Sequence, residues 1–393
     1  MTSSQGSVVV VGGGVFGAAA ALELRSRRWN VTLLDPYPLP YEGASSTDVS
    51  KVVRMDYGSD AFYHELAELA LEGWDRWNAD WPRPLYHEDG FLLLARGSMR
   101  LGGFEHESWR VLRDRGYQPE SLGGMLTRRF PAWSATAYSD GYFNPRAGWV
   151  ESGAVVERLL ALGAAAGVAR RVGALGERGL LFDEASRIRG VRTRAGEEIA
   201  ADRVVVCSGA WTPVLLPWLS DRLRTVAQPV LYFGVEDPAA FSGRVFPPWA
   251  ADIAGSGWYG FPALPDGRVK IGYHGPGRAT HPDERGRVGV DHVERARAFL
   301  REAIPVLAEA PLVGDRVCLY CDAFDGDFLI DRDPEREGLV VASGGSGHAF
   351  KFAPVLGSLV ADAVEGRSNR WGGRFGWRAV GETSREAARF KGD

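Results

Sequence analysis

The sequence predicts a two-domain α/β protein, in which a domain with a parallel sheet is interleaved with a second domain built on a mixed or antiparallel sheet. Two observations lead to this class. A strand, a glycine turn, a helix and a second strand follow one another between Ser7 and Asp35, and alternating strand segments fill residues 230–274. With 393 residues, of which 45% are hydrophobic and 24% charged, the chain is long enough for two ordinary cores.

The glycine turn has the spacing of a dinucleotide-binding motif. It occupies Gly12–Gly17, between the β-branched run Val8–Val11 and the helix-forming run Ala18–Leu24. Its first glycine permits a tight turn, its third residue lets backbone approach a pyrophosphate, and its last residue lets helix and strand pack closely. Asp35 ends the next strand, where an acid binds the ribose hydroxyls. The motif predicts a Rossmann-type dinucleotide site, and a glycine-rich turn in an ordinary α/β protein is the alternative.

The segment after Asp35 helps to distinguish a flavin nucleotide from a nicotinamide nucleotide. A nicotinamide domain would continue with further strand–helix repeats, but this chain runs into Pro36–Pro40 and then a Gly/Ser/Thr loop. That loop ends in a β-branched stretch with two cations, Lys51 and Arg54. An extended, ligand-facing segment fits this composition better than a crossover helix.

Hydrophobic period and capping residues predict the other elements. They are a helix from a Ser59 or Asp60 cap to Asp80 with Phe62, Leu66, Leu69, Trp74 and Trp77 on one face, a strand at Phe91–Leu94, a helix at 154–166, strands near Leu180 and Val191, a parallel strand at Arg203–Cys207, a helix at 293–301, a strand at Gly338–Ala342 and a helix at 353–364. The chain after Gly366 is a charged tail.

These segments place nucleotide-binding sequence at the start, middle and end of the chain. We therefore predict a cofactor domain made of residues 1–83, 149–218 and 321–393. A substrate domain made of residues 84–148 and 219–320 is inserted between its parts.

Composition excludes several classes of function. The net charge is -4 and there is no long basic run, which argues against a nucleic-acid partner or an anionic membrane surface. Three cysteines are too few for a disulfide framework, and the apolar run Ser7–Leu22 lacks the basic segment of a secretion signal. We expect a cytoplasmic protein without a metal site or membrane span; the oligomeric state is open, and a monomer is compatible with the sequence.

Lysine is rare in this chain, and its positions are informative. Three of the four lysines, Lys51, Lys270 and Lys351, lie in segments rich in glycine, histidine or hydroxyl residues, whereas Lys391 lies in the charged tail. Arginine serves almost everywhere else, so these positions favour sites that require a compact ammonium group. A chance distribution is the alternative.

Five segments in order, read together, resemble a group of flavin amine oxidases. The group comprises monomeric sarcosine oxidase, N-methyltryptophan oxidase and fructosyl amino acid oxidase, within the D-amino acid oxidase superfamily. The segments are Gly12–Gly17, Ser46–Arg54 with Met55–Gly58, the strand ending in Ser208–Trp211, Tyr259–Pro262 through Lys270, and Arg316–Tyr320 through Lys351.

The resemblance implies FAD as the cofactor, with its pyrophosphate over the glycine turn and its flavin ring near three loops. The implied cofactor-binding residues are Gly12, Gly14, Val15, Phe16, Gly17, Asp35, Pro36, Ser45, Ser46, Lys51, Val52, Val172, Ser208, Gly209, Trp211, Cys318, Gly344, Gly345, Gly347, His348 and Lys351. It further implies covalent attachment of the flavin through Cys318. For the pair Cys318 and Cys321, a redox dithiol and an inert buried pair are the alternatives.

The resemblance also implies catalytic roles. Lys270 corresponds to the lysine that activates oxygen, while Arg54 and Lys351 correspond to residues that bind the substrate carboxylate. The residues implied to surround the substrate are Tyr259, His274 and Tyr320. Strand alternation places His274 on the sheet face of Lys270, which favours a shared pocket, although a structural strand-end histidine is the alternative.

Two signals conflict over the substrate. The context of Lys51 resembles the fructosyl amino acid oxidases, but His274 stands where those enzymes carry a glutamate that binds sugar hydroxyls. We therefore predict an oxidase of a secondary amine, an N-alkyl or cyclic α-amino acid, that uses O₂ and gives an imine and H₂O₂. The alternatives are a fructosyl amino acid (Amadori product) oxidase and a flavin dehydrogenase with another electron acceptor.

Overall fold

The computed structural model describes residues 4–392 and contains two compact units. Unit 1 holds the residues through Val49, Glu151–Thr225 and Leu319–Glu386. Unit 2 holds Ser50–Val150, Val226–Cys318 and the residues from Ala387 onward. Two of the boundaries between the units fall within the long strands β14 (Leu223–Gly234) and β19 (Leu312–Ala323). The predicted α/β class with sheets of mixed orientation is confirmed.

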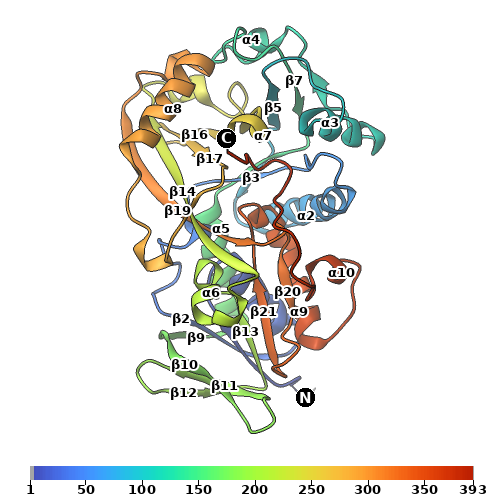
Figure 1. The fold of residues 1–393 in the computed structure, drawn as a ribbon, viewed down its shortest axis with the longest axis vertical. Helices are drawn as coiled ribbons and strands as arrows, with labels where there is room; N and C mark the ends of the chain where they lie inside the picture. Colours follow the sequence, from blue (N-terminus) through green and yellow to red (C-terminus); the bar gives the residue numbers. More distant parts are fainter. Residues whose placement is uncertain (1–3, 393) are drawn as a thin grey trace. The chain divides into compact units, whose positions relative to one another are not determined.

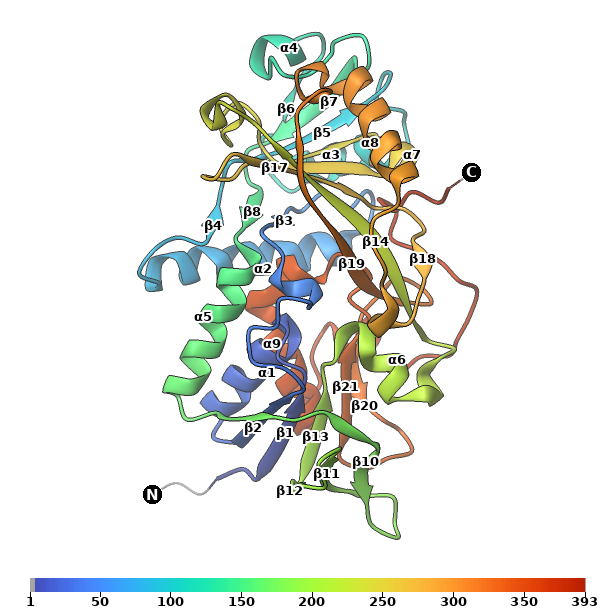
Figure 2. The same cartoon turned by 90° about the vertical axis from the view of Figure 1, so that its left-hand side faces the viewer.

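Unit 1 is built on a six-stranded sheet in the order β20–β21–β13–β1–β2–β9, whose strands are labelled in Figure 1 and Figure 2. β1 pairs in parallel with β2 and β13, as the motif predicts, and only β20 is antiparallel to its neighbour. The strands are β1 Ser7–Val11, β2 Asn30–Asp35, β9 Ala169–Val172, β13 Arg203–Val206, β20 Leu329–Arg332 and β21 Leu339–Ser343.

Helices cover one face of this sheet and a small sheet covers the other. Helix α1 (Val15–Ser26) contacts both α5 (Ser152–Ala165) and α9 (Ala353–Glu365), and Figure 2 shows the three helices beside the sheet. On the other face, valines of β1 and β13 share a buried core with the three-stranded sheet β10–β11–β12. The remaining elements are β10 Leu175–Phe182, β11 Ile188–Thr193, β12 Glu198–Ala200, α6 Thr212–Leu215 and α10 Gly372–Phe375.

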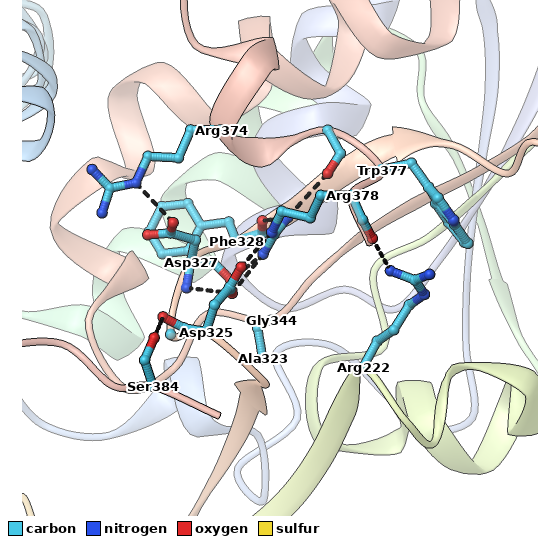
Figure 3. A network of polar contacts seen from close by, with 12 residues as sticks. Arg222, Ala323, Asp325, Asp327, Phe328, Gly344, Arg374, Trp377, Arg378 and Ser384 are labelled. Atoms are coloured by element: carbon cyan, nitrogen blue, oxygen red, sulfur yellow. Dashed lines mark hydrogen bonds and ion pairs between the residues drawn. The ribbon is translucent and has the colours of Figure 1, made fainter. Parts of the chain in front are cut away.

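The charged tail of unit 1 is tied to the loop before β20 by ion pairs and hydrogen bonds. Arg378 binds both carboxylate oxygens of Asp325, and Arg374 Nε donates to Asp327 Oδ2 at 2.7 Å (Figure 3). The backbone N–H of Ser384 donates to the carbonyl of Phe324 at 2.8 Å. The tail is therefore part of the folded unit, because its arginines pair with acids of this loop.

Unit 2 is built on the sheet β18–β14–β17–β16–β15–β5–β7–β6, with β19 paired to β14. The predicted antiparallel region is confirmed for β14, β17 and β16. Helix α8 (Val290–Ala303) lies beside these strands in Figure 1 and contributes Phe299 and Leu300 to the buried core. The other elements are β3 Lys51–Val53, α2 Ala61–Asp80, β4 Tyr86–His87, β5 Phe91–Ala95, α3 Phe104–Asp114, β6 Glu120–Ser121, α4 Leu126–Arg129, β7 Asp140–Asn144, β8 Gly148–Val150, β15 Trp249–Ala251, α7 Ile253–Ser256, β16 Trp258–Ala263, β17 Arg268–Tyr273 and β18 Arg278–Ala279.

Helix α2 begins and ends where the sequence predicts, but its buried face differs. Asp60 caps it by accepting from the backbone N–H of Tyr63 at 3.2 Å. Leu69, predicted on the buried face, is 38% exposed, whereas His64 is 1% exposed. The prediction was wrong for Leu69. Hydrophobic period does not mark His64, whose Nε2 lies 3.2 Å from the carbonyl oxygen of Gly58.

The units divide the chain differently from the predicted domains at residues 50–83. The sequence predicts these residues in the cofactor domain, whereas they fall in unit 2. There β3 pairs with β8, β8 pairs with β4, and α2 contacts β4. Among residues 4–392, no helix is both long enough and apolar enough to span a membrane.

Candidate active site

The glycine turn of unit 1 is held by two polar side chains. The backbone N–H of Gly13 donates to Asp35 Oδ2 at 2.8 Å, and that of Val15 donates to Ser46 Oγ at 3.0 Å. Gly12 has φ +103°, a conformation that side chains rarely adopt. A Cβ at Gly17 would lie 1.8 Å from the carbonyl oxygen of Gly12, so only glycine fits there. These contacts hold the glycine turn against the first residues of α1.

Asp35 organises the strand end as well as the turn. Its Oδ1 accepts from the backbone N–H of Tyr37 at 3.0 Å, and the side chain is 8% exposed. Burial raises the pKa of this carboxyl, while the N–H groups of Gly13 and Tyr37 act in the opposite direction. Pro36 follows directly, and Val172 of β9 is the parallel register partner of Asp35. Asp35, Pro36 and Val172 therefore lie at one end of the sheet.

Two further predicted residues come from the loop after β2 and from α1. Ser45 Oγ donates to the carbonyl oxygen of Leu319, which joins this loop to β19. The ring of Phe16 lies edge-on to Phe328 at 6.2 Å, and a Cβ at Gly345 would lie 3.5 Å from Phe16 Cε2. The approach of Phe16 to Gly345 links the first turn of α1 to the glycine loop that follows β21.

That loop, Gly344–His348, is packed between aromatic side chains. A Cβ at Gly347 would lie 2.3 Å from Cε2 of Tyr320, and its φ is +82°, so this position requires glycine. His348 is 5% exposed, and its Nε2 lies 3.1 Å from the carbonyl oxygen of Gly326. A carbonyl only accepts, so Nε2 carries the hydrogen.

Lys351 is buried in the turn that follows. It is 3% exposed, its Nζ donates to the carbonyl of His348 at 2.9 Å, and the ring centroid of Phe352 lies 5.4 Å from Nζ. A carbonyl and a ring thus hold this ammonium group within unit 1.

The turn after β13 is anchored by a chain of hydroxyl groups. Ser208 Oγ lies 3.1 Å from Thr212 Oγ1, and Thr212 Oγ1 lies 2.8 Å from Ser343 Oγ. Ser343 Oγ then donates to Cys321 Sγ at 3.4 Å. Gly209 and Trp211 follow Ser208 in this turn, and the ring of Trp211 lies 6.3 Å from that of Tyr41.

Lys270 of unit 2 is held in the middle of β17. It is 1% exposed, and its Nζ donates to the carbonyl of Ser50 at 2.6 Å. The ring centroid of Phe261 lies 4.5 Å from Nζ. Lys51 and Val52 follow Ser50 in β3, where they pair with Val150 and Trp149 of β8. Strand pairing therefore fixes both the lysine and its carbonyl partner.

Arg54, directly after β3, is surrounded by aromatic rings. Its guanidinium carbon lies 5.1 Å from the ring centroid of Tyr57 and 5.7 Å from those of Phe91 and Phe104. The side chain is 8% exposed. Contacts of this kind stabilise a planar cation through the ring faces and restrict its orientation.

The remaining predicted residues of unit 2 lie on or beside β16 and β17. Tyr259 is paired with Gly272, where an added Cβ would lie 2.4 Å from its hydroxyl oxygen. His274 is the first residue after β17, is 7% exposed and donates its backbone N–H to the carbonyl of Gly257 at 2.7 Å. Trp258 packs against Phe299 in the core, which favours a structural role for this tryptophan.

The three cysteines are buried and form no disulfide. Cys318 and Cys321 lie in β19, where three residues of rise separate Cα atoms by about 10 Å. A disulfide needs Cα atoms within about 7 Å, so this CxxC does not form a redox dithiol in the strand. Burial raises the pKa of the Cys321 thiol to about 11 and that of Cys207 further still.

Comparison with known proteins connects this geometry to a family. The model of the family described as FAD dependent oxidoreductase (DAO) matches residues 7–363. The chain belongs to this FAD-dependent oxidoreductase family.

Relatives and solved structures agree with this membership. The chain is 28% identical to monomeric sarcosine oxidase of Bacillus sp. (strain B-0618), over 93% of this chain and 94% of that protein. It is 28% identical to N-methyl-L-tryptophan oxidase of Escherichia coli O139:H28, over 92% and 95%. The structure of fructosamine oxidase (Amadoriase II) from Aspergillus fumigatus covers 100% of this chain and 95% of its own, with 26% identity and a TM-score of 0.85.

The residues of unit 1 fit the FAD of this oxidoreductase. The first turn of a helix has N–H groups that no carbonyl of the helix accepts, and these suit a pyrophosphate. A Cβ at Gly14 would meet only Ser46 in the protein, with Oγ at 3.2 Å, so the missing side chain leaves room beside the turn. Each carboxylate oxygen of Asp35 accepts one hydrogen bond from the protein and retains a lone pair for a ribose hydroxyl.

Sequence reasoning named Ser46 as a cofactor-binding residue but missed its contact to the helix, and it missed Tyr142 altogether. Ser46 binds the first helical N–H from 31 positions away, and Tyr142 binds Asp56 from 86 positions away. A Ser or Thr before a helix is a recognisable cap only when it is adjacent in sequence, so neither contact has a local signal. Within residues 4–392, no cluster of His, Cys, Asp or Glu is arranged to hold a metal ion.

Proposed function

We propose that this chain is an FAD-dependent oxidase of a secondary amine, an N-alkyl or cyclic α-amino acid. The C–H bond next to the nitrogen is broken, the products are an imine and H₂O₂, and water then hydrolyses the imine to an oxo compound and an amine. When bound, FAD accepts the hydride and passes the electrons to O₂.

The observation that carries this proposal is the environment of Lys270. Its ammonium group is 1% exposed, lies 2.6 Å from one carbonyl oxygen and faces the ring of Phe261. A positive charge that is already fixed and shielded from water stabilises negative charge that develops on oxygen, without reorganisation during the reaction. We therefore assign oxygen activation to Lys270.

Arg54 and Lys351 are the residues that we assign to the substrate carboxylate. Both side chains are buried, and aromatic contacts restrict both cations. A carboxylate held by a guanidinium fork and an ammonium group leaves the reacting carbon in one orientation, which lowers the barrier. We propose that Tyr259, His274 and Tyr320 shape the space around the amine. The amine reacts in its neutral form, so activity is expected to rise with pH as the bound amine loses its proton.

A fructosyl amino acid oxidase is the second candidate. It is favoured by the sequence around Lys51 and by the match to the Aspergillus fumigatus fructosamine oxidase structure. His274 argues for the N-alkyl amino acid, because an imidazole replaces the carboxylate that would bind sugar hydroxyls. The names of the Bacillus and Escherichia coli relatives point in the same direction.

A substrate panel tests this function. The purified holoenzyme is supplied in air with N-methyl amino acids, cyclic amino acids, fructosyl amino acids and the matching amines without a carboxylate, and H₂O₂ is measured. The proposal expects peroxide from secondary α-amino acids. Peroxide from fructosyl amino acids alone would select the second candidate. Reduction of an artificial dye without peroxide would indicate a dehydrogenase.

We further propose that the flavin is attached through Cys318, which is 3% exposed. The raised pKa values keep the thiols of Cys207 and Cys321 protonated near neutral pH, which disfavours these two cysteines as nucleophiles. Acid precipitation of the wild type should give yellow protein, and Cys318→Ala should release the colour. Cys321→Ala is the matched control and should retain it. Release of the colour from wild type would refute attachment but not binding.

A further inference from the structure

The segment that follows β3, Arg54–Gly58, is held in unit 2 by buried polar groups. Asp56 accepts from Tyr142 Oη at 2.5 Å and from Asn144 Nδ2 at 3.2 Å. Two residues further on, the backbone N–H of Gly58 donates to Ser108 Oγ at 2.8 Å. The side chains of Asp56, Ser108, Tyr142 and Asn144 are all fully buried, with 0% exposure. Water therefore does not replace a link that is removed.

The hydrogen bonds of this network run in one direction. Ser108 Oγ accepts from Gly58, and its own hydroxyl hydrogen binds Tyr142. Tyr142 in turn donates to the carboxylate of Asp56. Burial, followed by the charge of Asp56, raises the pKa of Tyr142 well above its ordinary value, so this phenol keeps its hydrogen. The network closes a loop from Gly58 through α3 and β7 back to Asp56.

Arg54 is the first residue of this segment. Two of the rings that contact its guanidinium group belong to residues beside the network. The side chain of Tyr57, which stands between the two anchored residues, is one of the rings against the guanidinium. The ring of Phe104, four residues before Ser108 on α3, is another, and it also approaches Gly58, where an added Cβ would lie 3.3 Å from it. The electrostatic fields of Asp56 and Arg54 both reach the Tyr142 hydroxyl. Displacing Asp56 or Ser108 would therefore move the rings that orient Arg54.

We propose that Tyr142 is a positioning residue, which through Asp56 fixes Arg54 in the orientation that binds the substrate carboxylate. This inference rests on the proposed function, because it takes the carboxylate as the ligand of Arg54. Tyr142 and Asp56 are 86 positions apart, so no local sequence pattern predicts their contact, and the role of Tyr142 is inferred from the buried contacts. A guanidinium that is oriented before the substrate arrives loses less conformational freedom on binding.

The test compares the binding of methoxyacetate to four forms of the holoenzyme by titration calorimetry. Methoxyacetate has the shape of N-methylglycine with an oxygen in place of the nitrogen, so it presents the carboxylate without being an amine. The forms are wild type, Arg54→Met, Tyr142→Phe and Tyr138→Phe. Tyr138 is the matched control, because it is a buried tyrosine of unit 2, 1% exposed, whose hydroxyl has no hydrogen-bond partner among the described residues.

We expect Tyr142→Phe to weaken binding by about tenfold or more, since a hydrogen bond to a charged group is lost in a dry site. Arg54→Met should weaken it further, and Tyr138→Phe should stay within about twofold of wild type. Ser108→Ala, which removes the preceding link, should weaken binding by less than Tyr142→Phe and serves if that variant does not fold. The thermal midpoint of each form is measured alongside.

Three other outcomes would overturn the inference in distinguishable ways. If Arg54→Met weakens binding but Tyr142→Phe and Ser108→Ala do not, the positioning role is wrong and the proposed carboxylate role of Arg54 stands. If wild type and Arg54→Met bind methoxyacetate equally, the carboxylate role itself is wrong, and the positioning role is refuted with it. Equal weakening by Tyr138→Phe would indicate a general loss of unit 2 structure and would also refute the specific role.

Discussion

In unit 1 the predicted functional residues are mostly held by neighbours in the sequence, whereas in unit 2 they are held by contacts between distant segments. Gly13 and Asp35 are 22 positions apart, and Lys351 and His348 are 3 apart. Lys270 and its partner Ser50 are 220 positions apart. Unit 1 has exceptions, among them the bond from Ser45 to Leu319, the bond between Thr212 and Ser343, and the contact of Phe16 with Phe328. A nucleotide site can therefore be recognised as a motif, whereas a site for the reacting groups requires the fold.

The two units also differ in what surrounds their acidic side chains. In unit 1, Asp325 and Asp327 are paired with Arg378 and Arg374 in the network of Figure 3. In unit 2, burial is the main influence on the charge of some groups. The clearest example is Glu105, whose pKa burial and then the charge of Asp252 raise to about 7. Paired acids favour a fixed charge, while isolated buried acids make a unit sensitive to pH.

The largest expected effects come from two substitutions in the glycine turn. One should prevent folding, and the other should weaken cofactor binding. Gly17→Ala should prevent stable folding, because the added methyl group would lie 1.8 Å from the carbonyl oxygen of Gly12. Gly14→Ala should fold, since its methyl group would meet only the end of the Ser46 side chain, but it should bind FAD more weakly. Thermal unfolding and flavin content distinguish the two. A Gly14→Ala protein with full flavin content would contradict the pyrophosphate assignment.

The second effect concerns Lys270. Lys270→Met should slow reoxidation of the reduced flavin by O₂ by about a hundredfold or more, while anaerobic reduction by substrate changes little. Rapid-mixing absorbance measurements of each half-reaction give the two rates. The same loss in both half-reactions would show that Lys270 supports the fold or the substrate and not oxygen.

The third effect concerns the two cations, Arg54 and Lys351, that we assign to the substrate carboxylate. Arg54→Met and Lys351→Met should each raise KM for an N-methyl amino acid by about tenfold to a hundredfold, as expected for a lost charged hydrogen bond. KM for the matching amine without a carboxylate should change far less. Steady-state kinetics with both substrates gives the comparison, and equal changes in both KM values would assign the residue a structural role.

The smallest net effect is a pH dependence of stability in unit 2. Glu105 keeps its proton up to about pH 7 in the folded state, so the free energy of unfolding falls as pH rises from about 4.5 to 7. Burial lowers the pKa of His292 to about 4, so that group makes the same free energy fall as pH drops from about 6.5 to 4. The two slopes partly cancel in wild type.

Glu105→Gln should remove the fall in the free energy of unfolding as pH rises from about 4.5 to 7, and it should leave the fall caused by His292 as pH drops from about 6.5 to 4. Relative to wild type, the variant should gain about 1 to 3 kcal/mol of unfolding free energy between pH 4.5 and 7. Urea unfolding across this range measures the gain. Glu107→Gln, on the same helix, is the control and should give no such rise, because His106 and then Arg110 hold the pKa of Glu107 below its ordinary value. If the difference in the free energy of unfolding between Glu105→Gln and wild type does not change over about pH 4.5 to 7, Glu105 is ionised across this range.

The comparison also explains what the sequence predicts and what it does not. The glycine turn, β2 ending in Asp35 and the Asp60 cap of α2 are encoded within short windows, and all three are confirmed. The burial of His64, the Ser46 contact to α1 and the Asp56–Tyr142 bond depend on segments that meet only after folding. Hydrophobic period cannot reveal them, because polar residues buried by tertiary contacts look like surface residues.

The central claim, that this chain oxidises a secondary amine with O₂, is tested most directly by following the flavin of the wild-type protein through one cycle. Under nitrogen, an N-methyl or cyclic α-amino acid is added until the flavin absorbance is bleached, and oxygenated buffer is then mixed in. The account predicts bleaching by the secondary amine, rapid return of the absorbance with O₂, and one H₂O₂ per flavin. Bleaching without rapid return would identify a dehydrogenase, and absence of bleaching by every secondary amine would contradict the account.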